Sequence, residues 1–208
     1  MKVLFTTLFI LMSSFVSAEQ KVVTDKGEEV ILYSNGTWEY TNQAIENNTE
    51  IKTNNRSFKK TKDSTFLIKS SKNNTGYWID TNKWEYTKTS ENSDVEYQFN
   101  LRGRDLFGMT IAEEVEMSLE TLADIALTNA KNVAPNARVV KKEYRNVNGV
   151  KVLYMELTGT IDGINFKYFG YYHTDESGST QFLAYTAENI APKYEKEIQD
   201  FLNGFTLQ

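Results

Sequence analysis

The sequence predicts an α+β protein, in which helices flank an antiparallel β-sheet and a small β-hairpin and a linker come before it. Residues 94–101 alternate apolar and polar side chains, which is the period of a half-buried strand. Further on, four segments of strand character follow one another between short turns, and segments with helical spacing precede and follow them. Consecutive strands joined by tight turns pair antiparallel, and helices segregated against such a sheet define the α+β class.

The first eighteen residues have the layout of a secretory signal peptide. Lys2 gives a positive start, residues 3–12 are mostly apolar, and Val16-Ser17-Ala18 places small residues before a cleavage site between Ala18 and Glu19. The apolar stretch is shorter than the roughly 20 residues of a spanning helix. We therefore expect a periplasmic or secreted protein without a stable membrane anchor after cleavage. A retained anchor and a cytosolic terminus are the alternatives.

Residues 19–40 predict a β-hairpin segment. Asn35-Gly36 stands between runs rich in β-branched and aromatic residues, and both residues tolerate the positive φ of a two-residue hairpin turn. An isolated hairpin is marginally stable in water, so we expect it to pack against another surface.

Residues 41–65 predict a flexible linker, because they are rich in Asn and Thr and hold few apolar side chains. The segment also holds a basic cluster of Arg56, Lys59, Lys60 and Lys62. The alternative is that this cluster docks an acidic partner or a lipid headgroup.

Residues 66–208 predict one folded domain. Short strands are expected at 66–68, 77–79 and 84–86, followed by the strand 94–101 and an apolar run over 105–115. Ser118 then precedes apolar residues at helical spacing, as an N-cap does, and this helix stops near 132–135.

The second half of this domain predicts a four-stranded meander and a closing helix. The turns are Asn148-Gly149, Asp162-Gly163 and residues 175–178, and the expected strands are 138–147, 150–161, 164–174 and 181–186. The last helix is expected over 190–202, with Pro192 in its first turn and Gly204 after its end.

Composition excludes several chemistries. The formal net charge is −5, and loss of Lys2 with the signal makes it more negative, which argues against nucleic acid as a partner. The chain has no cysteine, which excludes thiol catalysis, zinc–thiolate sites and iron–sulfur clusters. We expect no cofactor.

No catalytic or metal site is predicted. His173 is the only histidine, and Asp175, Ser177 and Ser179 crowd the turn beside it, whereas nucleophilic catalysis needs groups from separate rigid elements. A histidine–carboxylate metal site is the alternative, although one imidazole and two solvated acids make a poor cage for a metal ion. The acidic cluster Glu113, Glu114 and Glu116 could supply paired carboxylates, but acids before a helix also suit its dipole.

Four residues are candidates for contact with a partner: Trp38, Arg102, Arg104 and His173. Arg102 and Arg104 lie two apart at an expected strand end, so both would face the same way and could grip a carboxylate or phosphate. More often, arginines in such a position are rim residues that pair with a nearby Glu. Trp38, Trp78 and Trp84 could line a ligand groove or pack in a core.

Two parts of the chain resemble known families. Asn35-Gly36-Thr37-Trp38 resembles the NGTW hairpin that follows the signal in many exported bacterial proteins. Residues of about 66–207 resemble the PsbP-like α/β/α sandwich, which includes the photosystem extrinsic protein and the Ran-binding Mog proteins. The matching features are the helix from Ser118 and the segments 138–140, 148–149, 159–163, 169–172, 184–189 and 201–205.

The resemblance carries no catalytic motif and implies a binding or assembly factor. We therefore predict an exported, non-catalytic binding or accessory protein whose partner is an envelope protein. The alternative is a carrier that holds a small molecule or lipid between sheet and helix, lined by Phe166, Tyr168 and Tyr172. A hydrolase is the second alternative.

Overall fold

The computed structural model describes residues 20–23, 29–33, 36–40, 51–90 and 94–208, which fall into two compact units divided at residue 50. The first unit contains an antiparallel sheet of three short strands: β1 (Gln20–Val23), β2 (Glu29–Leu32) and β3 (Trp38–Tyr40). The register places Leu32 opposite Trp38, and Gly36 has the positive φ of 83° that the turn requires. The predicted cleavage site at Ala18 and Glu19 lies outside the described residues.

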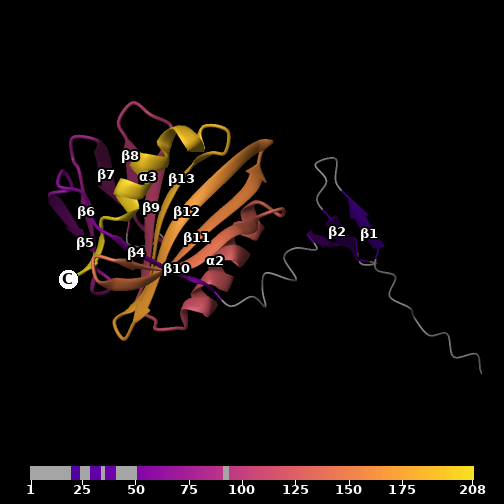
Figure 1. Ribbon diagram of the computed structural model, residues 1–208, viewed down its shortest axis with the longest axis horizontal. Coiled ribbons are helices and arrows are strands. Elements are labelled where there is room, and N and C mark those ends of the chain that lie inside the picture. Colours follow the sequence, from indigo (N-terminus) through magenta and orange to yellow (C-terminus); the bar gives the residue numbers. More distant parts are fainter. Residues whose placement is uncertain (1–19, 24–28, 34–35, 41–50, 91–93) are drawn as a thin grey trace, which may run out of the picture. The chain divides into compact units, whose positions relative to one another are not determined.

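The second unit is built on an eight-stranded sheet in the order β4-β10-β11-β12-β13-β9-β8-β7 (Figure 1). Its strands are β4 (Thr53–Phe58), β7 (Trp84–Lys88), β8 (Val95–Leu101), β9 (Phe107–Glu113), β10 (Arg138–Val147), β11 (Val150–Ile161), β12 (Ile164–Asp175) and β13 (Gly178–Ala187). Every neighbouring pair is antiparallel except β4 and β10, which are parallel. A second sheet of three strands joins β14 (Phe205–Leu207), β6 (Thr75–Ile79) and β5 (Phe66–Lys69).

The predicted meander is confirmed, because its turns have the backbone conformation that their residues favour. Asn148 and Asp162 both adopt φ 50°, and the glycines that follow them also have positive φ. Asn and Asp tolerate this region and glycine enters it at no steric cost. Each turn therefore joins two long strands in fixed register.

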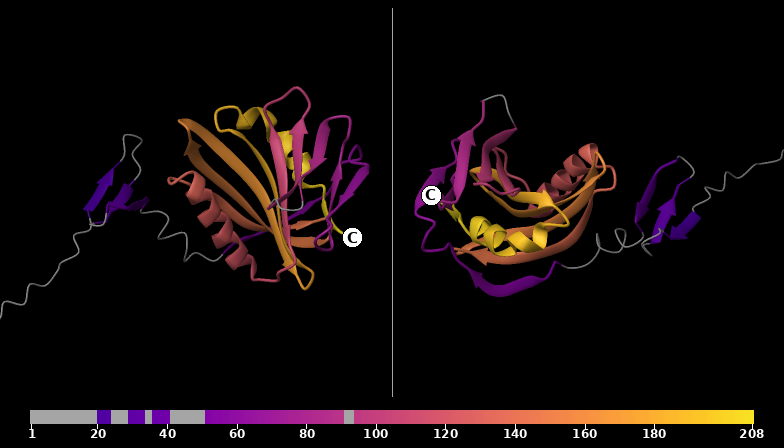
Figure 2. Two further views of the ribbon diagram at one scale, coloured as in Figure 1. Left: turned by 180° about the vertical axis from the view of Figure 1, so that it is seen from behind. Right: turned by 90° about the horizontal axis from the view of Figure 1, so that it is seen from above.

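Two helices cover opposite faces of the large sheet. α2 (Leu119–Val133) begins at the predicted N-cap Ser118, whose side chain accepts a hydrogen bond from the backbone N–H of Thr121. The expected last helix consists of a 3-10 turn, η1 (Ala191–Tyr194), followed by α3 (Glu195–Leu202). Figure 2 shows the strands of the large sheet curving around α3. The predicted α+β class with an antiparallel sheet between helices is confirmed.

The sheet separates two hydrophobic cores. Adjacent residues of β12 enter different cores: Tyr171 packs with Phe182 and Phe201 on the α3 side, and Tyr172 packs with Leu122 on the α2 side. This alternation follows from the period of two along a strand. Each long strand thus contributes one row of side chains to each core.

The predicted linker over 41–65 is wrong for its second half. Residues 41–50 lie outside the described part, but the second unit begins at Glu50 rather than at 66, and β4 forms the edge of the large sheet. The composition of this segment predicted a linker, but β4 is ordered by contacts with residues far away in the sequence. Its backbone pairs with β10, Asn54 donates to Glu143 (3.0 Å), and Phe58 packs under the Arg145 guanidinium.

Candidate functional site

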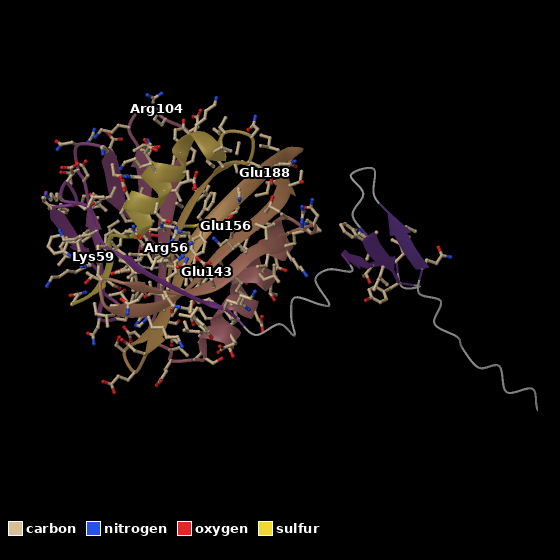
Figure 3. All side chains as sticks on the ribbon, viewed as in Figure 1. Arg56, Lys59, Arg104, Glu143, Glu156 and Glu188 are labelled. Carbon is tan, nitrogen blue, oxygen red and sulfur yellow. The ribbon has the colours of Figure 1, made fainter. Side chains whose placement is uncertain are left out.

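A cavity of about 540 Å³ opens on the α3 side of the sheet, between β4, β10–β12 and the η1–α3 segment. Its walls combine charged and aromatic side chains: Arg56, Phe58, Lys141, Arg145, Tyr154, Glu156, Lys167, Phe169, Glu188 and Glu195. In Figure 3, Arg56, Glu143, Glu156 and Glu188 follow one another across this region, while Arg104 lies apart at one end of the unit. We call this the Arg145 cavity.

Arg145 is the most deeply buried charge of the cavity, with 5% of its surface exposed. Its Nε donates to Glu143 Oε1 over 2.6 Å, and Nη1 lies 3.3 Å from the Tyr171 hydroxyl. The guanidinium lies 3.4 Å from the Tyr154 ring centroid and 4.5 Å from that of Phe58. Cation–π contact and a carboxylate together offset the cost of burying the charge.

These contacts determine the protonation states of the side chains around Arg145. Burial disfavours the ionised form of Glu143, but hydrogen bonds from Asn54 and Arg145 outweigh burial, so that the pKa of Glu143 is lowered. Burial lowers the pKa of Arg145, but contacts with Tyr171 and Glu143 outweigh burial. The pKa of Arg145 is therefore above its ordinary value. Burial raises the pKa of Tyr154, with a further contribution from Glu156. Glu143 therefore stays ionised and Tyr154 protonated near neutral pH.

Further ion pairs and hydrogen bonds occupy the walls. Lys167 Nζ lies 2.8 Å from Glu156, which also accepts from the Tyr154 hydroxyl at 2.8 Å. Glu188 accepts from Thr158 over 3.1 Å. A general acid or base works best with a pKa near the operating pH, which neither Glu143 nor Tyr154 has. Chemically, this arrangement can hold a ligand that presents charges of both signs and apolar surface.

A second cavity, of about 180 Å³, lies on the opposite face, between α2 and the sheet. Its lining is mostly apolar: Met109, Ile111, Ala126, Ala130, Val133, Ala134, Ala137, Leu157, Ile161 and Leu183, with Tyr168, Tyr172, Asn129, Thr158, Gly159 and Gln181. Tyr168 and Tyr172 are two of the three residues expected to line a carrier pocket; Phe166 does not line it. We call this the α2 cavity.

His173 is largely buried, and both of its ring nitrogens have a partner within the second unit. It lies near the end of β12 with 8% of its surface exposed, its Nδ1 is 3.2 Å from the Lys151 carbonyl, and its Nε2 is 3.3 Å from Asp175. Ser177 donates to Asp175 over 2.6 Å, not to His173. Burial opposes ionisation of Asp175, yet hydrogen bonds from Ser177 and His173 lower its pKa.

The other predicted contact residues do not form one site. Arg102 and Arg104 follow the last residue of β8 and lie in a turn, so the period of two that would align them does not apply. Arg102 pairs with Glu85, and Arg104 is exposed. Trp38 belongs to the first unit, where it is 43% exposed. Trp84 is buried and stacks on Phe201 with ring centroids 4.1 Å apart.

The acidic cluster stays on the surface, where Glu113, Glu114 and Glu116 are all exposed. Among the residues that the structure describes, no three His, Asp or Glu side chains are placed to hold a metal ion.

Sequence reasoning did not single out Arg145, Glu143 or Gln181. Glu143 and Arg145 lie two apart in β10, which was the only local signal that their side chains share a face. Gln181 was visible as a polar residue at the start of an expected apolar strand. In the structure it is 7% exposed and lines the α2 cavity.

The comparisons with known proteins support the fold. No family model matches the chain, and no curated protein matches it. Among solved structures, the chain is similar to cyanobacterial PsbP from Synechocystis sp. PCC 6803, with TM-score 0.53, 13% identity, and coverage of 71% of this chain and 95% of that one. The predicted PsbP-like fold is therefore confirmed at the level of fold.

Two further solved structures are less similar, with TM-scores below 0.5. A protein of unknown function from Pseudomonas aeruginosa has TM-score 0.40 and 11% identity, with coverage of 64% and 89% of the two chains. A protein from Bacteroides thetaiotaomicron VPI-5482 has TM-score 0.41 and 10% identity, with coverage of 65% and 45%. Within the part of the chain that the structure describes, no helix is long and apolar enough to cross a bilayer.

Proposed function

We propose that the chain is an exported, non-catalytic binding protein that engages a segment of an envelope protein in the Arg145 cavity. The observation that supports this most is the Arg145 cavity itself: about 540 Å³, with charges of both signs and three aromatic rings on its walls. Pockets of this size are typical of binding sites, and the charged groups of this one give it a polar lining.

The state of the charged groups favours binding over catalysis. Arg145 is paired with Glu143, and Lys167 with Glu156, so these groups are already oriented by rigid strands. A preorganised site loses less entropy when a ligand binds. A peptide segment that carries both signs of charge can pair with the cavity walls, whereas a polyanion such as nucleic acid would meet Glu156, Glu188 and Glu195.

The first unit offers a second, weaker contact with the same partner. Leu32 and Trp38 are opposite each other in register and both are exposed. An aromatic side chain of this kind is a common anchor at interfaces. Joining two weak contacts on one chain raises the effective concentration of the second to the millimolar range.

The test is affinity capture from envelope extracts of the source organism, with the mature chain and two double variants. Arg56→Glu with Lys141→Glu reverses two exposed charges at the Arg145 cavity, and Lys62→Glu with Lys72→Glu makes the same change in net charge away from it. We expect one protein to be enriched by the native chain and the control, and lost with the cavity variant. Equal enrichment by both variants, or turnover of a substrate in a hydrolase screen, would contradict the proposal.

A small-molecule or lipid carrier is the second candidate, and the α2 cavity favours it. That cavity lies between sheet and helix and is lined by Tyr168 and Tyr172, two of the three residues expected for a carrier pocket. Native mass spectrometry of protein purified from its host tests it: a reproducible bound mass supports a carrier, and its absence favours the protein partner alone.

A further inference from the structure

The α2 cavity exists because one face of α2 changes from large to small side chains. The first half of the helix packs Leu122 against the sheet, whereas Ala126 and Ala130 follow at intervals of four residues and Ala134 is the C-cap. Residues four apart share a helix face. Since alanine cannot fill the distance between helix and sheet, the C-terminal half of the helix leaves a hollow above the strands.

The floor of this hollow is shaped by Gly170. A Cβ at this position would come within 2.5 Å of Leu183 Cδ2 and 2.8 Å of Tyr172 Cε2. The glycine therefore lets the Tyr172 ring lie over its own strand, and the ring lines the α2 cavity instead of filling it.

Two residues with polar side chains, both largely buried, line the α2 cavity. Tyr172 is 1% exposed and Gln181 is 7% exposed, and they are direct cross-strand neighbours on β12 and β13. No described residue forms a hydrogen bond with either side chain. Burial is also the sole cause of the raised pKa of Tyr172. Both side chains are thus available to a bound molecule.

The lining also sets the charge of that molecule. It contains no Asp, Glu, Lys, Arg or His, so an ionised ligand would be desolvated without a counter-charge. Size sets a further limit: an apolar cavity of about 150 Å³ holds benzene, and this one is about 180 Å³.

We propose that the α2 cavity binds an uncharged molecule of about one aromatic ring that carries a single hydrogen-bonding group, recognised by Gln181 and Tyr172. This inference deepens the carrier candidate and rests on the chain being a binding protein. It is independent of the Arg145 cavity, which lies on the other face of the sheet.

The test titrates the mature chain with phenol, toluene and benzoate and follows the methyl NMR signals of Ala130, Leu157 and Leu183, all of which line the α2 cavity. We expect phenol and toluene to shift these methyl signals. Benzoate should leave them unchanged at concentrations at which phenol saturates the cavity. In Gln181→Leu, the ratio of the toluene Kd to the phenol Kd should fall about fivefold, because only phenol loses a hydrogen bond. Tyr172→Phe removes only the hydroxyl and should lower the same ratio.

Two further variants control for bulk and for general effects. Ala130→Leu should weaken phenol and toluene alike by at least tenfold, whereas Asn132→Leu adds the same side chain at an exposed position of α2 and should change neither. Gln98→Leu repeats the glutamine substitution at an exposed strand position. The proposal is overturned if neither probe shifts the cavity methyls, as in a cavity that holds water only, or if both Gln181→Leu and Tyr172→Phe leave the ratio unchanged. None of these titrations involves a protein partner, so a failure here is separate from a failure of the proposed function.

Discussion

The Arg145 side chain donates from Nε to Glu143 Oε1 over 2.6 Å, two residues along the same strand. Glu143 also accepts from Asn54 of β4, so one carboxylate joins the buried cation to the edge strand. This pair links the stability of the sheet edge to the geometry of the Arg145 cavity.

Replacing the carboxylate should therefore destabilise the second unit. We expect Glu143→Gln to lower the free energy of unfolding at pH 7 by about 1–3 kcal/mol, because Arg145 remains buried with a weaker partner. Urea unfolding of both proteins measures the difference.

The same pair predicts a pH dependence. The folded pKa of Glu143 is below its ordinary value, so its ionised form stabilises the native state. That contribution is complete above about pH 5 and is lost as pH falls through the folded pKa. The gap in stability between the native chain and Glu143→Gln should therefore narrow towards pH 3. A gap that is constant with pH would show that the carboxylate charge is not responsible.

The core between α2 and the sheet gives a second prediction. Leu122→Asp should unfold the second unit, since it places an unpaired charge where the side chain is 2% exposed. Ile125→Asp, on the exposed side of the same helix, should change the free energy of unfolding by less than about 1 kcal/mol. Thermal melting followed by circular dichroism distinguishes the two variants. Cooperative melting of Leu122→Asp near the native temperature would mean that the helix face is wrongly assigned.

The edge strand gives a third prediction. A chain of residues 66–208 lacks β4 and leaves Glu143 without Asn54, whereas residues 50–208 keep both. We expect the shorter chain to melt about 4–8 °C lower, since a loss of about 2 kcal/mol lowers Tm by that amount at this size. Differential scanning calorimetry compares the two chains. Equal melting temperatures of the two chains would show that β4 does not stabilise the second unit.

These elements show what sequence alone can predict and where it stops. Ser118 and Asn148-Gly149 act through their own backbone, so their residue types predicted a helix start and a turn. β4 was missed because it is stabilised by partners almost ninety residues away in the chain. Arg145 gave no local sign of burial, since its ring contacts come from Phe58, Tyr154 and Tyr171 on three other strands.

The α2 cavity could not be predicted from any single segment. Ala126 and Ala130 are ordinary core residues by sequence, and only their position over Tyr172 and Gln181 produces a hollow. The expectation that Arg102 and Arg104 face the same way used the period of two along a strand, but both residues lie in a turn.

The N-terminus gives a fourth prediction. The exported protein should begin at Glu19, because Val16-Ser17-Ala18 supplies the small residues that signal peptidase requires. Intact-mass measurement of the protein from culture fractions determines the first residue. A retained Met1 in the membrane fraction would refute export as a cleaved protein.

The most direct test of the central claim is site-specific crosslinking from the rim of the Arg145 cavity. The chain has no cysteine, so Glu195→Cys carries a benzophenone maleimide at one exposed rim position, and Lys72→Cys carries it away from the cavity. Each labelled protein is illuminated in envelope extract, and adducts are identified by mass spectrometry. Engagement of an envelope protein in this cavity predicts one adduct from position 195 that is absent from position 72 and is suppressed by Arg56→Glu with Lys141→Glu. No adduct, or the same adducts from both positions, would contradict it.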